Sequence, residues 1–134
     1  MKNSSIKKKI INAPISIGEL IDKITILEIK KNKLQNSKFE NVLKELSFLR
    51  KLMEKHQIEI TDNLFTQLKE INLTLWNIED QIRIKEKNKE FDNIFIELAR
   101  SVYFTNDKRF KIKSEINTFF GSSVVEEKEY IEYQ

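Results

Sequence analysis

The stretch Asp62–Ile82 reads DNLFTQLKEINLTLWNIEDQI and carries the most regular apolar repeat in the chain. Its apolar residues recur at alternating intervals of four and three, at Leu64, Leu68, Ile71, Leu75, Ile78 and Ile82. This spacing forms one seam along an α-helix and is typical of coiled coils, whereas a strand would alternate every second residue. The pattern therefore predicts a long helix that Asp62 caps and that ends at about residue 89.

Two shorter helices are predicted upstream of this seam. The segment Ser16–Glu19 fits the Ser-x-x-Glu capping box, in which both side chains satisfy unpaired amides at a helix N-terminus. Apolar residues at three- and four-residue spacing carry this first helix to about Gln35. The segment Ser37–Glu40 repeats the motif after a tight turn at Asn36, so a second helix should follow at once. So short a loop predicts an antiparallel hairpin of the two helices.

Downstream of the seam, two more helix starts are visible. Asp92 is the expected N-cap of a fourth helix, and Asn106 or Asp107 that of a fifth helix ending at Gly121. The whole chain holds only two glycines and one proline, so little interrupts these helices. The predicted fold is an all-α bundle of four to five helices that opens with the antiparallel helical hairpin.

We expect one helical domain over residues 14–121. A polar N-terminal arm of residues 1–13 precedes it, and an acidic tail of residues 122–134 packs on the domain or extends from it. Ile10, Ile11 and the β-branched residues of the tail could also pair as a minor two-stranded patch that joins the two ends.

The composition excludes several classes of function. Zero cysteines rule out disulfides and thiolate metal sites, and a single histidine leaves carboxylates as the main ligands of any metal. A net charge of +3 gives no strong nucleic-acid signal, because the basic residues are not interleaved with aromatic ones. The apolar runs are too short to span a membrane, and no apolar segment follows the first lysines, so a cytoplasmic protein is expected.

A polar stripe borders the apolar seam of residues 62–89. It contains Asn72, Trp76, Glu79 and Arg83 at three- and four-residue spacing. Ion pairs along the helix would make this stripe an ordinary solvated face, which is the commoner arrangement. The alternative is a groove between helices, in which Trp76 and Asn72 lie beside charged residues that bind a ligand.

A second candidate site lies around the expected start of the fifth helix, where basic residues gather. Arg100 and Arg109, with Tyr103 and Asn106 to orient a ligand, could hold a phosphate or another anion there. A solvated basic surface is the alternative explanation.

Four carboxylates on the first and third expected helices form a candidate metal site. Glu19 and Asp22 lie about one turn apart on the first helix, and Glu79 and Asp80 are adjacent on the third. Paired acids on facing helices hold divalent cations in helical bundles, so Mg²⁺ is the expected ion if a metal binds. Such pairs also arise by chance in a chain that is 34% charged.

Much of the chain resembles an uncharacterised family of small bacterial and phage proteins, a domain of unknown function. The resemblance rests on the segments Ala13–Lys30, Leu75–Arg83 and Leu98–Asp107, together with Gly121, Ser122 and Glu126–Lys128. Members of this family sometimes accompany glycosyltransferase-like or tetratricopeptide regions. That neighbourhood implies a link to surface-glycan metabolism but identifies no catalytic residue.

Two functions are compatible with these patterns. The first is a small helical binding or accessory module whose polar groove takes a partner protein or an anionic ligand. The alternative is a Mg²⁺-dependent enzyme that acts on a nucleotide, a nucleotide sugar or another phosphorylated small molecule, with carboxylates holding the metal and arginines the phosphate. The regular seam also allows a homodimer.

Overall fold

The computed structural model describes residues 8–133, and helices are the only regular secondary structure in that range. The all-α prediction is therefore confirmed, while the predicted strand pairing of the two ends is absent from the described residues. Residues 1–7 of the predicted N-terminal arm lie outside them. The four helices are α1 (Ile17–Lys33), α2 (Asn36–Lys55), α3 (Asp62–Lys87) and α4 (Asn93–Phe120).

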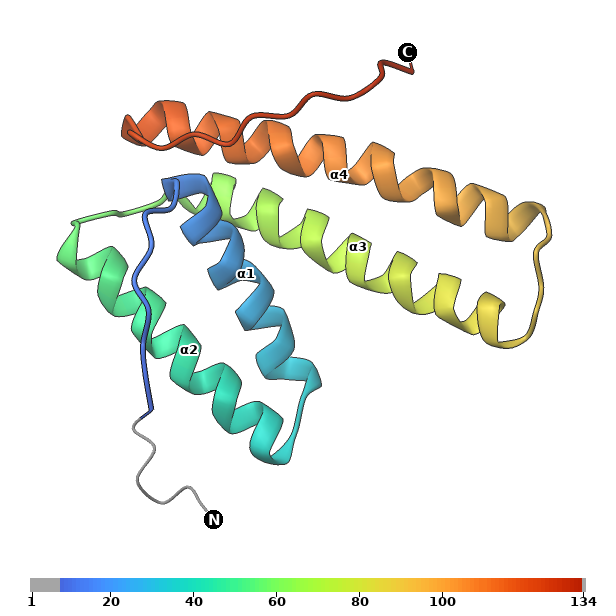
Figure 1. Cartoon of the computed structure of the whole chain (residues 1–134), viewed down its shortest axis with the longest axis horizontal. Helices are drawn as coiled ribbons and strands as arrows, with labels where there is room; N and C mark the ends of the chain where they lie inside the picture. The colour runs from blue at the N-terminus through green and yellow to red at the C-terminus, as the bar shows by residue number, and fades with distance from the viewer. Residues whose placement is uncertain (1–7, 134) are drawn as a thin grey trace.

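The helices form two antiparallel hairpins of unequal length (Figure 1). The first hairpin, α1 and α2, is the one that the short loop predicts, and α3 and α4 form the second. Helix α1 lies between the other elements, because it contacts α2 as well as α3 and α4. The chain after α4 turns back and runs alongside that helix (Figure 1).

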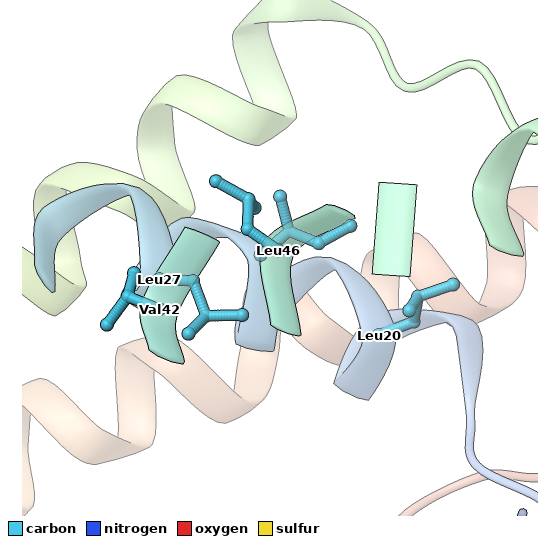
Figure 2. Close-up of a cluster of buried hydrophobic side chains, with 5 residues drawn as sticks. Leu20, Leu27, Val42 and Leu46 are labelled. Atoms are coloured by element: carbon cyan, nitrogen blue, oxygen red, sulfur yellow. The ribbon is translucent and has the colours of Figure 1, made fainter. Parts of the chain in front are cut away.

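The two faces of α1 enter two separate apolar cores. Leu20, Ile24 and Leu27 pack against Val42 and Leu46 of α2, as Figure 2 shows for four of these residues. Each such side chain stabilises the fold by about 1.5–3 kcal/mol when fully buried. The second core joins the next face of α1 to the long hairpin, and its buried members are Ile21, Leu68, Ile112 and Ile116.

The start of α1 confirms half of the predicted capping box. Oγ of Ser16 accepts a hydrogen bond from the amide of Glu19 at 3.0 Å. The carboxylate of Glu19 instead bonds Lys113 on α4, so it does not return to the cap amide. Folding brings the ammonium of Lys113 next to Glu19, and a cation is a stronger hydrogen-bond partner than a neutral amide.

The predicted caps of α2 and α3 are wrong. Helix α2 starts at Asn36, which has a positive φ of 61°, and Gln35 before it makes no side-chain cap bond. The tight turn at Asn36 places Ser37 inside the helix, where it cannot act as a cap. Thr61 caps α3 through the amide of Leu64, one residue before the predicted Asp62.

The predicted fourth and fifth helices are one continuous helix, α4. Asp92 caps it, accepting from the amide of Phe95 at 2.9 Å, and Gly121 ends it at a φ of 62°. Both ends are as predicted, but the cap at Asn106 or Asp107 is wrong. Asn106 and Asp107 prefer N-cap positions, but this preference is weaker than the tendency of the helix to continue through a segment without glycine or proline.

The apolar seam of α3 is used within the chain. Leu68 is wholly buried in the second core, and Ile78 is buried further along the same helix. The coiled coil between two copies stays a prediction. Across residues 8–133, no helix combines the length and the apolar composition that a membrane span requires.

Candidate functional site: a buried polar cluster beside a groove

Asp22 on α1 lies at the centre of a buried polar cluster. Its side chain is wholly buried, and Nδ2 of Asn72 on α3 donates to Oδ1 at 2.8 Å. From α4, Nε of Arg109 donates to the same oxygen at 3.1 Å, and Nη2 bonds Oδ2. A buried carboxylate stays ionised only when such partners replace the water that it has lost. Asp22 therefore ties α1, α3 and α4 together.

Thr25, one turn after Asp22, determines which way the amide of Asn72 faces. The Thr25 hydroxyl donates to the main-chain oxygen of Asp22 at 2.7 Å and accepts from Nδ2 of Asn72 at 2.8 Å. A carboxylate only accepts hydrogen bonds, so Asn72 must turn its NH₂ group toward Asp22. Both hydrogens of that group are thereby used.

Lys113 on α4 is the second buried cation of the cluster. Its Nζ lies 2.7 Å from Glu19, 2.9 Å from Glu126 in the C-terminal tail and 3.8 Å from Asp22. Burial alone would lower the pKa of Lys113, but the hydrogen bonds that its ammonium donates to Glu19 and Glu126 outweigh burial and raise that pKa above its usual value. Lys113 therefore stays charged and holds the tail against α4.

Gly18 allows α1 to approach α4 closely enough for these contacts. A Cβ atom at this position would lie 2.5 Å from the carbonyl oxygen of Lys113. The Gly18 amide donates to Oδ1 of Asn117 at 2.6 Å, and the Ile17 amide donates to Oγ of Ser122 at 3.1 Å. Side chains thus satisfy the first amides of α1, so this helix end offers no open anion site.

A groove opens between α1, α3 and α4 at the edge of the cluster. Its hollow measures about 370 Å³. The side chains around it include six that the sequence singles out, and the complete lining is Ile26, Ile29, Asn72, Leu75, Trp76, Glu79, Asp80, Arg83 and Arg109. The structure thus places Asn72 and Trp76 beside a hollow, while Asp80 and Arg83, which also line it, are exposed to solvent. Binding of a ligand there stays a prediction.

The charges around the groove are mixed. Arg83 lies 3.6 Å from Glu79, and both side chains are largely exposed, so this pair contributes little to stability. Nζ of Lys33 lies 5.6 Å from the centroid of the Trp76 ring and adds a positive charge beside it. Two further cations, Lys33 and Arg83, therefore lie on the same side of the molecule as the Trp76 ring and the groove.

A family of unknown function, DUF6165, matches residues 11–133 of the sequence. The chain belongs to DUF6165. The match includes every residue of the polar cluster and of the groove. No significant match is found among curated proteins or among solved structures. Since membership of DUF6165 carries no mechanism, function has to be argued from the site itself.

Three of the predicted ligand residues in this DUF6165 chain lie outside the groove. Arg100 is exposed and pairs with Glu97 at 3.1 Å. Tyr103 packs edge-on against Tyr133 of the tail. Asn106 lines a separate, smaller hollow of about 170 Å³, together with Arg109, Lys113 and tail residues. Because α4 is continuous, no helix N-terminus exists here to bind an anion.

The four predicted metal ligands are not gathered into one site. Glu19 and Asp22 are bonded to Lys113 and Arg109, whereas Glu79 and Asp80 line the groove. Within residues 8–133, no group of three or more acidic or histidine side chains is placed to share a metal ion. Cations of the protein itself bind Glu19 and Asp22, the two predicted ligands on α1.

Several members of the DUF6165 cluster were not predicted as site residues: Thr25, Asn117 and Glu126. One signal was available in the sequence. Gly18, Asp22 and Thr25 follow one another at helical spacing and interrupt an otherwise apolar face of α1. Polar residues on a buried face need partners, so this interruption indicates a buried polar network.

Proposed function

We propose that this DUF6165 chain is a non-catalytic binding module whose groove holds an anionic group of a small ligand through Arg109. The observation that carries the proposal is the way Asp22 holds this guanidinium. Nε and Nη2 face the buried carboxylate, which uses one edge of the planar group. The edge formed by Nη1 and Nη2 is the one that binds a second carboxylate or a phosphate in bidentate fashion.

The available edge of Arg109 supports binding for two reasons. No hydrogen bond of Nη1 exists within residues 8–133, and no side-chain nitrogen or oxygen buried in that range lacks a partner, so Nη1 is in contact with solvent. The bond to Asp22 also raises the pKa of Arg109 and keeps its position fixed. A preorganised donor loses little freedom when a ligand binds.

The shape of the groove favours a small ligand over a partner protein. A hollow of about 370 Å³ falls within the range of roughly 300–1,000 Å³ that is usual for small-molecule sites. Trp76 supplies an apolar face, and Lys33 and Arg83 add positive charge near it. Support for binding over the enzymatic alternative comes from the dispersal of the four predicted metal ligands, since no three acidic or histidine side chains in residues 8–133 are placed to share an ion.

Fluorescence of Trp76, the single tryptophan of the chain, tests the proposal directly. Benzoate and phenyl phosphate should alter the emission in a saturable manner, whereas neutral benzamide should not. Arg109→Lys keeps the charge, but an ammonium cannot bind Asp22 and a second carboxylate through two separate edges of one planar group. Benzoate should therefore bind about tenfold more weakly.

Arg100→Lys is the matched control, because Arg100 lies outside the groove and should leave benzoate binding unchanged. Equal binding of benzamide and benzoate, or no binding of either anion to the unmodified protein, would contradict the proposal.

A further inference from the structure

Asn72 presents an unused hydrogen-bond acceptor beside Arg109. Its NH₂ group donates one hydrogen to Asp22 and the other to Thr25, and no donor among residues 8–133 bonds Oδ1. Exchanging the oxygen and nitrogen of the amide would set two acceptors against each other at Asp22, so the orientation is determined chemically.

This oxygen is accessible from the groove. Asn72 is 94% buried, yet no buried side-chain oxygen or nitrogen in the described part of the chain lacks a partner. Oδ1 therefore touches solvent, and the hollow that Asn72 lines is the one of about 370 Å³ beside Trp76. A nearly buried acceptor that opens into a cavity is satisfied when water or a ligand donates to it.

The acceptor and the guanidinium are close neighbours because both are anchored on one atom. Nδ2 of Asn72 and Nε of Arg109 lie 2.8 Å and 3.1 Å from Oδ1 of Asp22, so these two nitrogens are at most about 6 Å apart. One small molecule can therefore contact a fixed donor and a fixed acceptor at the same time.

We infer that the ligand of the groove is a carboxylic acid that also carries a hydroxyl or N–H donor, with its carboxylate on Arg109 and its donor on Oδ1 of Asn72. This inference rests on the proposed function and names the chemical class that the same site takes.

The surroundings of the acceptor discriminate against other anions. Glu79 and Asp80 line the same groove and also present only acceptors when ionised. A phosphate offers almost only acceptor oxygens near neutral pH, so it would leave Oδ1 of Asn72 unpaired and face these carboxylates. A hydroxyl or amide N–H removes that conflict, and the Trp76 ring offers a face for the ring or carbon skeleton of the acid.

Pairs of ligands that differ only in the donor test the inference on the unmodified chain, by titration of Trp76 fluorescence. Mandelate and phenylacetate share a ring and a carboxylate, but only mandelate has a hydroxyl. Glucuronate and tetrahydropyran-2-carboxylate form a second pair, in which the hydroxyls of glucuronate lie farther from the carboxylate than the hydroxyl of mandelate does. The hydroxylated member of at least one pair should bind roughly three- to tenfold more tightly. Methyl mandelate, which keeps the hydroxyl without the charge, should not bind.

The outcomes separate this inference from the proposed function. If both hydroxyl-free acids bind as tightly as their hydroxylated partners, the donor is irrelevant and the inference is wrong, while the anion-binding proposal stands. If none of the acids binds, both are wrong. Asn72→Ala adds a second measurement where circular dichroism shows that it folds, because the preference within the responding pair should then fall to about onefold. A preference that persists in Asn72→Ala contradicts the assignment to Oδ1.

Discussion

The carboxylate of Asp22 is a full charge with no exposure to solvent, and its neighbours explain how the fold tolerates it. Asn72 and Arg109 donate to it, and Lys113 lies close by. Removing one member of such a group is costly because the other charges then remain buried without a partner. At this scale, stability and the proposed ligand site depend on the same atoms.

Asp22→Asn should lower the free energy of unfolding by about 3 kcal/mol, since Arg109 and Lys113 would lose their shared anion. Urea denaturation followed by circular dichroism measures the change. Glu79→Gln is the control, because its exposed ion pair should contribute less than about 1 kcal/mol. Equal effects of the two substitutions would show that the buried cluster does not stabilise the fold.

Gly18→Ala should also destabilise the protein, although alanine is the better helix former. The new methyl group would meet the carbonyl oxygen of Lys113, and relief of that contact should cost about 1–3 kcal/mol. Gly121→Ala provides the comparison, since its Cβ would meet no atom within 4 Å and only the positive φ of 62° opposes it, at about 1 kcal/mol. Thermal unfolding of both variants checks the order, and a more stable Gly18→Ala variant would contradict the close packing of α1 on α4.

At the scale of the elements, α1 is the helix on which the others depend. One face packs on α2, another on α3 and α4, and its polar positions meet the buried cations. Glu28 on α1 pairs with Arg50 of α2 at 2.5 Å and with Lys31 of its own helix at 3.1 Å. Burial alone would raise the pKa of Glu28, but these two cations outweigh it and lower the pKa below its ordinary value.

The hairpin of α1 and α2 should therefore lose stability in acid through Glu28. A lowered pKa in the folded state means that stability is present above the unfolded value of about 4.3 and is lost as the pH falls through the folded value. Between pH 5 and 3, the free energy of unfolding should fall more steeply for the unmodified protein than for Glu28→Gln. Urea titrations at each pH measure both slopes, and parallel slopes would exclude this role of Glu28.

At the scale of the whole molecule, the C-terminal tail is attached to α4 and contributes a carboxylate to the buried polar cluster. Glu126 bonds Lys113, and Tyr133 bonds Asp107, which raises the pKa of Tyr133 to about 12. Of the two arrangements that the sequence allows for the tail, the structure shows packing along α4 (Figure 1).

Divalent metal should leave the stability of the whole protein unchanged if the groove is a metal-free binding site. Thermal unfolding with and without millimolar Mg²⁺ or Mn²⁺, each tested alone and with a nucleotide, measures this by mass action. With metal alone, the midpoint of thermal unfolding should equal that of the protein without metal. A metal-dependent rise that Glu79→Gln abolishes would favour the enzymatic alternative.

The helices of this protein can be read from local patterns in its sequence. Spacings of three and four residues locate all four, and Ser16, Asp92 and Gly121 mark three of their ends. These signals are local, because caps and helical faces depend on residues within a turn of one another. The predicted break at Asn106 is wrong for the same reason, since a local preference for a cap is weaker than the continuity of a long helix.

Which polar residues meet depends on how the helices pack, and this could not be predicted from the sequence. Asp22 bonds Asn72 and Arg109, which lie 50 and 87 positions away in the chain, and no periodicity connects such distant residues. Sequence spacing indicated that Asn72, Trp76, Glu79 and Arg83 share a face, but it could not show that Arg109 joins them and that Arg100 does not. The packing of α1 on the long hairpin made that choice, because Gly18 lets the two backbones approach until Asp22 reaches the guanidinium.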